Sequence, residues 1–137
     1  MRITEQTRYA LRIIAACARR HPARVRVGDL SRETGITEAN IFKLLKTVTK
    51  VGFLESSRGP GGGVAMTLAP DRLMVGQVVR VLESRFYSCA PVDLLTPAPP
   101  EQDDIERRVN EAIGRGLNAF LAELDHIPIS FLLRDGT

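Results

Sequence analysis

The residues that could carry out chemistry are few, and their spacing fits no known catalytic motif. The chain contains two cysteines, Cys17 and Cys89, and two histidines, His21 and His126. Two cysteines cannot form a disulfide framework, and histidines this far apart form no recognisable metal motif. The sequence also has no nucleophile elbow, and the glycine-rich stretch 59–63 lacks the lysine and hydroxyl residue that complete a phosphate-binding loop. We therefore expect that the protein is not an enzyme.

Cys89 is the candidate sensing residue, and its role is open to three interpretations. A single exposed cysteine acts as a redox switch where basic neighbours favour the thiolate, and Arg85 is the nearest such neighbour. Its oxidised form could be a disulfide to Cys17 or to a second copy of Cys89. An inert thiol, or a small-molecule pocket between the predicted fourth helix and the predicted long C-terminal helix, explains the sequence as well. Cys17 falls beside the apolar face of a predicted helix, where a buried, unreactive thiol is the usual outcome.

The length and composition indicate one domain with a small appendage. A chain of 137 residues can bury a real core, and 44% of its residues are hydrophobic. No apolar run approaches the roughly 20 residues that cross a membrane. The first five residues lack the basic-then-apolar layout of a signal peptide. We expect a cytoplasmic protein without a membrane segment.

Charge is distributed unevenly along the chain, although the net charge is only +3. Residues 1–60 contain 12 Lys/Arg and 5 Asp/Glu, a net charge of +7, whereas residues 61–137 contain 7 and 11, a net charge of −4. A basic half suits contacts with the phosphates of nucleic acid. The acidic half would stay away from them.

Residues 25–68 carry the strongest structural signal. The spacing predicts a helix over Val27–Thr34 and a second helix that ends near Lys50, with Gly35 as the break between them and Ile36 as an apolar plug. Thr37 can cap the second helix, because its hydroxyl accepts a hydrogen bond from an unpaired amide. The apolar face of the second helix consists of Ile41, Leu44, Leu45 and Val48. Two short helices around a glycine turn form a helix-turn-helix, which in DNA-binding proteins places the second helix in the major groove.

A glycine-rich hairpin follows this second helix. Strands are predicted at 53–56 and 64–68, and the segment SRGPGGG between them carries one arginine and almost no other side chains. Such a tip can push its backbone into a narrow groove, as the wing of a winged helix-turn-helix does. Because the same geometry also occurs as plain helix packing with a flexible loop, a protein-interaction module without sequence-specific DNA binding is the alternative function.

The other helices follow from apolar spacing. We predict a first helix over residues 4–20, capped by Thr4 and strongly basic on its outer side. After a turn, Asp71 is the predicted cap of a fourth helix, whose stripe is Val75, Val78, Val79 and Leu82. A loop with four of the eight prolines follows, and a loop of this length in a small domain is either functional or disordered.

A single long helix is predicted over residues 101–125, and its apolar stripe is longer than one small domain needs. The predicted dimer-interface residues are Ile105, Val109, Ile113, Leu117, Phe120 and Leu124. An ordinary core helix that folds back is the alternative, but we prefer the dimer because a helix-turn-helix reads half-sites best as a symmetric pair. The apolar tail 127–133 is expected to pack on this interface.

The predicted fold is therefore mainly α with a small β-hairpin wing: a winged helix-turn-helix plus a long C-terminal dimerisation helix. Residues 1–84 form the DNA-binding domain, 85–100 a candidate sensing loop, and 101–137 the dimerisation helix and a short tail.

Several motifs resemble the Rrf-two family of winged helix-turn-helix regulators, over nearly the whole chain. They are MRIT at 1–4, RYA at 8–10, Val27 with Leu30, GFL at 52–54, and RGPGGG at 58–63, the most specific of them. The resemblance implies a homodimer with crossed long helices that binds a palindromic operator in double-stranded DNA and usually represses. It also implies recognition-helix contacts from Thr37, Glu38, Ala39, Asn40 and Lys43, and wing contacts in the minor groove from Arg58, Gly59, Pro60 and Gly61.

The sequence departs from the cluster-binding members of this family. Those members place three cysteines in the loop before the long helix, whereas this loop has only Cys89 and no histidine. A relative can also use an acidic side chain early in the partner's first helix, but Arg8 stands near that position here. Because an iron–sulfur cluster needs about four ligands, we predict no cofactor, no iron–sulfur cluster and no metal. The expected signal is a redox or small-molecule effector.

Overall fold

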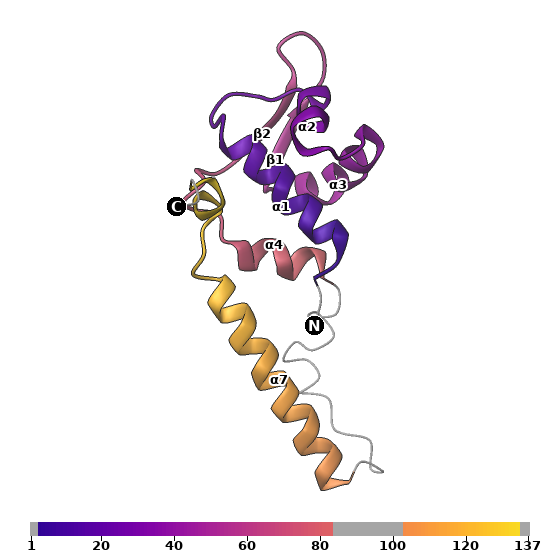
Figure 1. Ribbon diagram of the computed structural model, residues 1–137, viewed down its shortest axis with the longest axis vertical. Helices are drawn as coiled ribbons and strands as arrows, with labels where there is room; N and C mark the ends of the chain where they lie inside the picture. Colours follow the sequence, from indigo (N-terminus) through magenta and orange to yellow (C-terminus); the bar gives the residue numbers. More distant parts are fainter. Residues whose placement is uncertain (1–2, 84–102, 135–137) are drawn as a thin grey trace.

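The computed structural model of the chain describes residues 3–83 and 103–134 (Figure 1). Its elements are α1 (Glu5–Ala18), α2 (Val27–Thr34), α3 (Glu38–Lys50), β1 (Leu54–Ser57), β2 (Gly63–Met66), α4 (Val75–Leu82), α7 (Asp104–Leu124) and the 3₁₀ helix η1 (Ile129–Leu133). This mostly helical architecture with one antiparallel hairpin confirms the predicted fold class. The predicted loop at 85–100, with Arg85 and Cys89, lies outside the described residues, and the three-part division of the chain stays a prediction.

Helix α1 forms the centre of the core and packs against α2, α3, β2, α4 and η1. Thr4 caps it as predicted, since its hydroxyl accepts a hydrogen bond from the amide of Thr7. The helix ends at Ala18, two residues before the predicted end, because the amides of Arg20 and His21 close tighter, three-residue turns. Its buried face includes Ile13, Ile14 and Cys17. Truncating a fully buried isoleucine of this kind to alanine typically costs about 2–5 kcal/mol of folding free energy.

The hairpin forms a small sheet at the edge of this core. Leu54 pairs with Met66 and Ser57 with Gly63, so five residues are left for the tip. Both strands lie within one residue or two of the predicted positions. Val25 extends the sheet, since its amide and carbonyl each bond to Val64, at 2.8 and 2.7 Å. The wing is thereby tied to the segment that leads into α2.

The structure corrects one predicted helix cap. Helix α4 begins at Val75, and its cap position is Met74, whose amide donates to the side-chain oxygen of Gln77 at 2.9 Å. Asp71 is exposed in the preceding turn and caps nothing, because the chain needs three more residues before it turns into the helix.

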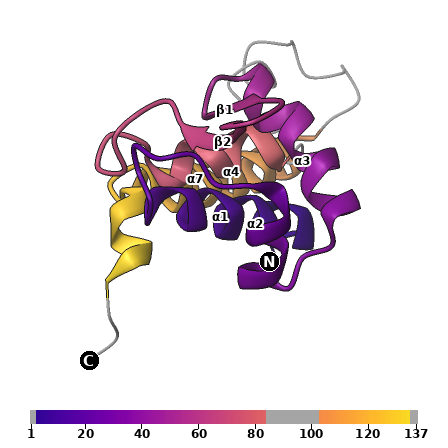
Figure 2. The same cartoon turned by 90° about the horizontal axis from the view of Figure 1, so that it is seen from above.

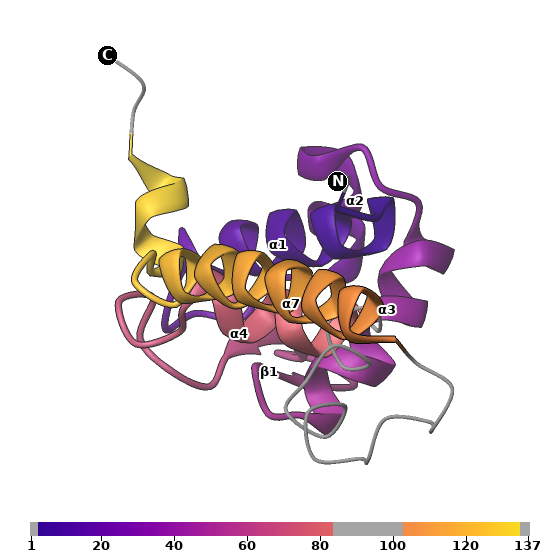
Figure 3. The same cartoon turned by 90° about the horizontal axis from the view of Figure 1, so that it is seen from below.

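Helix α7 lies at the opposite end of the molecule from the wing (Figure 1). The views from above and below agree that it lies beyond α1 and α4 as seen from the wing (Figures 2 and 3). It begins at Asp104, with the Asp103 carboxylate accepting the amide of Glu106 at 2.7 Å, and ends at Leu124. Among the described residues, the C-terminal half of α7 makes its contacts with the body of the protein, where Leu121 is buried.

The apolar tail does not lie where the sequence placed it. η1 packs against α1, and Ile129 is fully buried with its amide bonded to the Leu73 carbonyl at 2.8 Å. The tail therefore closes the core of its own winged domain and is not seated on the exposed face of α7. The Val75 amide, which donates to the Ile127 carbonyl at 2.8 Å, joins the same two segments.

We expect Gly76→Ala to destabilise the fold by about 1–3 kcal/mol, because it overpacks the junction of α4 and α7. A Cβ on Gly76 would lie 2.1 Å from the Asp125 Oδ1 atom and 2.8 Å from the Asp125 amide nitrogen. Urea unfolding measures the change. Gly114→Ala on α7 is the matched control: a Cβ there meets nothing within 4 Å, so a small gain in stability is expected. Equal stabilities for the two variants would contradict the close contact.

Candidate nucleic-acid interface

The turn between α2 and α3 is fixed by local hydrogen bonds. Gly35 ends α2 with φ +72°, a left-handed conformation that favours glycine, and its amide donates to the Ser31 carbonyl. The Ser31 hydroxyl donates to the Ile36 carbonyl at 2.7 Å, and the Ile36 side chain is buried between the helices. Thr37 then caps α3 by accepting the Asn40 amide at 3.3 Å. The predicted break, apolar plug and cap are all confirmed.

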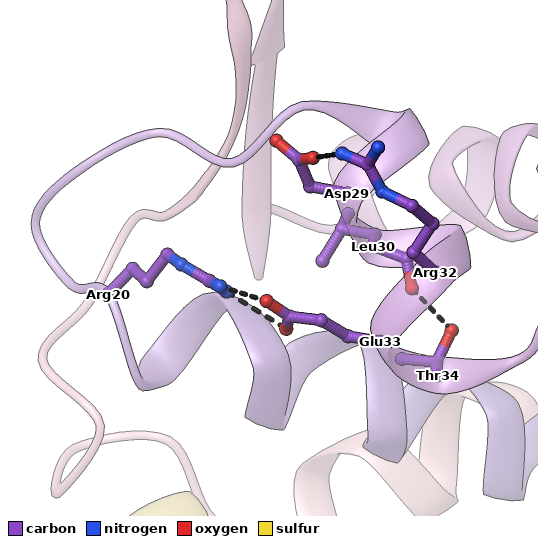
Figure 4. A network of polar contacts seen from close by, with 6 residues as sticks. All are labelled: Arg20, Asp29, Leu30, Arg32, Glu33 and Thr34. Carbon is purple, nitrogen blue, oxygen red and sulfur yellow. Dashed lines mark hydrogen bonds and ion pairs between the residues drawn. The ribbon is translucent and has the colours of Figure 1, made fainter.

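Helix α2 is held against α1 by buried apolar contacts and a polar network (Figure 4). Leu30 has no exposed surface, while the Arg20 guanidinium makes two bonds to the Glu33 carboxylate. The buried Thr34 hydroxyl donates to the Leu30 carbonyl at 2.6 Å, and Arg12 donates to the Thr34 carbonyl. Exposed ion pairs contribute only about 0–1 kcal/mol to folding stability. The buried Leu30 therefore provides most of the stability of this contact, and the Arg20–Glu33 pair helps to orient α2 on α1.

Helix α3 turns one face to the core and leaves the other in solvent. Ile41, Leu44, Leu45 and Val48 are 0–6% exposed, which confirms the predicted apolar face. The predicted contact residues Thr37, Glu38, Ala39 and Lys43 are exposed, and Asn40 is half-buried. The same outer face adds Phe42, Lys46, Thr47 and Lys50, all exposed.

The wing tip is a compact turn that exposes Arg58, Gly59, Pro60 and Gly61. Gly62 closes the turn through its amide, which donates to the Gly59 carbonyl at 2.9 Å. A Cβ on Gly62 would lie 2.5 Å from the Ser57 carbonyl oxygen, so the turn has no room for a side chain there. At the base of the hairpin, Arg24 donates to the Ser57 hydroxyl at 2.8 Å. The tip is therefore narrow and fixed to the body.

A surface groove of about 500 Å³ joins the helices to the wing. Its rim includes Arg26 and Arg32 of the α2 region, Phe42 of α3, and Gly59 and Gly62 of the wing. The groove brings one α3 residue, Phe42, beside one predicted wing residue, Gly59, while the other predicted contact residues do not line it. Arg26, Arg32 and Phe42 were not among the contact residues predicted from the sequence. Phe42 could have been found, because it is the one large apolar residue of α3 that falls off the buried stripe.

Comparison with known proteins agrees with this architecture. A family model named Rrf2, described as an iron-dependent transcriptional regulator, matches residues 3–135. The chain belongs to the Rrf2 family. This is the Rrf-two family that the motifs indicated, so the resemblance is confirmed.

Individual relatives align over almost the whole chain. "Protein aau3" of Rhizobium meliloti is 31% identical over 134 residues, which cover 98% of this chain and 86% of the relative. The transcriptional regulator NsrR of Geobacillus kaustophilus is 28% identical over 98% of this chain and 91% of its own length. The structure of CymR, the global cysteine regulator of Bacillus subtilis, superposes with a TM-score of 0.76 at 22% identity, covering 98% of this chain and 99% of that one. The last comparison shows the fold alone.

The Rrf2 family description mentions iron, which raises the question whether the residues of this chain could bind it. Cys17 is fully buried in the core, and desolvation raises its pKa to about 12 despite the nearby Arg20. A thiol held in its neutral form is a poor iron ligand, because the thiolate is the species that binds metal. Among residues 3–83 and 103–134, no group of three His, Cys, Asp or Glu side chains could hold a metal ion. The described residues of this Rrf2 protein therefore do not fit an iron–sulfur cluster, and Cys89 lies outside them.

The predicted dimer-interface residues fall into two groups. Ile105, Val109 and Ile113 are 73%, 44% and 57% exposed, whereas Leu117, Phe120 and Leu124 are partly covered by the core of their own chain. The exposed three follow one another at intervals of four residues, so they form one stripe along the N-terminal half of α7. We call these three residues the α7 stripe. No helix among the described residues is long and apolar enough to cross a membrane.

Proposed function

We propose that this Rrf2 protein is a homodimeric repressor that binds a palindromic operator in double-stranded DNA. Helix α3 lies in the major groove, with Thr37, Glu38, Ala39, Asn40 and Lys43 toward the bases. The wing tip, with Arg58, Gly59, Pro60 and Gly61, enters the adjacent minor groove. The proposal rests on one observation: residues of α2, α3 and the wing line the same surface groove. A cytoplasmic location follows from access to bacterial DNA.

Cationic side chains around this face supply the affinity. Lys46 and Lys50 lie along the exposed side of α3, and Arg26 lies at the groove. Contacts with phosphate fix the register of a protein on DNA, while the contacts with base edges give the sequence preference. These cations, together with the polar side chains at the start of α3, suit this division between phosphate and base contacts.

The dimer is proposed from the α7 stripe. Three large apolar side chains in a row on an otherwise charged helix face would remain in water in a single chain. A second copy of α7 crossing the first would cover them, and the two winged domains would then face two half-sites. A two-fold symmetric protein matches a palindromic operator for this reason.

A salt titration separates the proposed function from its rival, a winged domain that binds only protein. If three cationic side chains of each protomer contact phosphate, six contacts per dimer give a slope of log K against log salt of about −5. We expect such a slope with any duplex of sufficient length. An affinity for duplex DNA that is too weak to measure even at low salt would favour the protein-interaction module.

We propose that DNA binding needs no iron, because the described residues hold no ligand set and the whole chain has only two cysteines. Protein purified without oxygen is expected to be colourless and to bind DNA equally before and after treatment with an iron chelator. Iron and sulfide analysis and an absorbance spectrum measure this directly. A brown preparation with stoichiometric iron and sulfide, whose DNA affinity falls on chelation, would contradict the proposal.

The signal is proposed to be a redox or small-molecule effector. Cys89 is the candidate thiol, and the high pKa of buried Cys17 argues against a second reactive cysteine. Oxidant should change operator affinity in the wild type and leave Cys89→Ser unaffected. An identical response in Cys89→Ser would leave a small-molecule effector as the better explanation.

A further inference from the structure

The outer face of α3 contains one residue that the proposed DNA contacts leave unexplained. Phe42 is 54% exposed, and among the described residues of the winged domain it is the most exposed large apolar residue, ahead of Val51 and Leu68. Single exposed apolar residues are common and need no explanation by themselves. The exposure of Phe42 is informative because of where this residue lies on α3.

Phe42 is the fifth residue of α3 and lies one turn after Glu38, at the helix end that points toward the bases in a helix-turn-helix. Lys43 and Lys46 lie beside it and one turn beyond, on the same exposed side. Its ring borders the groove between α2 and the wing, where Gly59 and Gly62 present no side chains that could cover it. The Phe42 ring is therefore accessible to a ligand, and the lysines beside it suit contacts with DNA phosphate.

The chemistry of the ring limits what it can recognise on DNA. A phenyl group neither donates nor accepts a conventional hydrogen bond, so it cannot read the polar edges of guanine, adenine or cytosine. The one apolar group that a base pair presents in the major groove is the 5-methyl group of thymine, and phenylalanine is among the side chains that contact it. Burying this methyl group against the ring removes apolar surface of both from water.

We propose that Phe42 is a specificity-determining residue that covers the methyl group of one thymine in each half-site. This inference rests on the proposed function, because it assumes that α3 enters the major groove. It adds a base preference that the hydrogen-bonding side chains Asn40 and Lys43 cannot supply. A protein partner that covers the ring instead is the competing explanation.

Replacement of thymine by uracil tests the proposal, since it removes the methyl group and preserves every hydrogen bond. The operator is first selected with the wild-type protein from random duplexes, and each thymine is then replaced symmetrically in both half-sites. At about 0.8 kcal/mol for each methyl group, loss of two should weaken wild-type binding about 15-fold at one thymine position. Phe42→Ala should bind the thymine operator more weakly and show no dependence on uracil at that position.

Val51→Ala is the matched control, because it also removes exposed apolar surface at α3 and should keep the 15-fold dependence. Thermal unfolding checks that both variants fold. An unchanged uracil dependence in Phe42→Ala, or an operator with no methyl-dependent thymine, would overturn the inference and leave the proposed function intact. If the wild type enriches no duplex at all, the proposed function fails and the inference fails with it.

Discussion

We expect Ile113→Glu to convert the dimer into a folded monomer and to lower operator affinity by about 10²–10⁴-fold, because two linked half-site contacts become independent. Ile113 is 57% exposed in the single chain, so the glutamate leaves the monomer fold unchanged. In a dimer the same side chain would be buried among apolar residues, where an unpaired charge is too costly to keep. Light scattering and operator titration measure the two effects.

The matched control places the same charge elsewhere on α7. Asn118→Glu adds a carboxylate at an exposed position away from the α7 stripe, and this variant should stay dimeric with full affinity. Leu117→Glu and Phe120→Glu are less informative variants, because both side chains also pack on the core of their own chain. An unchanged dimer for both Ile113→Glu and Val109→Glu would rule out the α7 stripe as the interface.

Arg58→Ala should weaken binding to every duplex, specific or not, by about 1–3 kcal/mol per wing. Arg58 is the one charged side chain of the tip, and a cation in the narrow minor groove is attracted by its enhanced negative potential. Removing it should also reduce the salt slope by about one for each wing. Titration of operator and random duplex at several salt concentrations measures both changes.

Two sets of control variants distinguish a specific role of Arg58 from a general effect of the protein's net positive charge. Arg108→Ala removes the same charge from exposed α7, at the opposite end of the molecule, and should leave both duplexes bound as in the wild type. Asn40→Ala and Lys43→Ala should instead change the preferred sequence, because their side chains can reach base edges. Equal binding by Arg58→Ala and the wild type would show that the wing does not enter the groove.

Local signals in the sequence were sufficient for the winged domain. Gly35, Ile36 and Thr37 each act through their nearest neighbours, so their roles as break, plug and cap could be predicted from residue type and spacing alone. The hairpin was similarly predictable, because its glycines and two short apolar runs are adjacent in the chain. The family motifs covered the same segment.

Long-range packing is what the sequence could not provide. An apolar stripe looks the same whether its own chain or a partner covers it, so the division between Ile113, which is exposed, and Leu117, which meets the core, needed the fold. The tail was misplaced for the same reason, since the amides of Ile129 and Ser130 donate to carbonyls of residues more than 50 positions earlier. Asp71 was predicted as the cap of the fourth helix because of its residue type, but α4 begins four residues later, at Val75.

Selection from random duplexes is the most direct test of whether the protein binds a palindromic operator as a dimer. The purified wild-type protein is mixed with a library of random double-stranded DNA at physiological salt, and bound sequences are recovered over several rounds. We expect enrichment of a palindrome with two half-sites whose centres lie about one helical turn, roughly 10 base pairs, or a multiple of it apart. Recovery of sequences without any common motif, from a protein that is dimeric and folded, would contradict it.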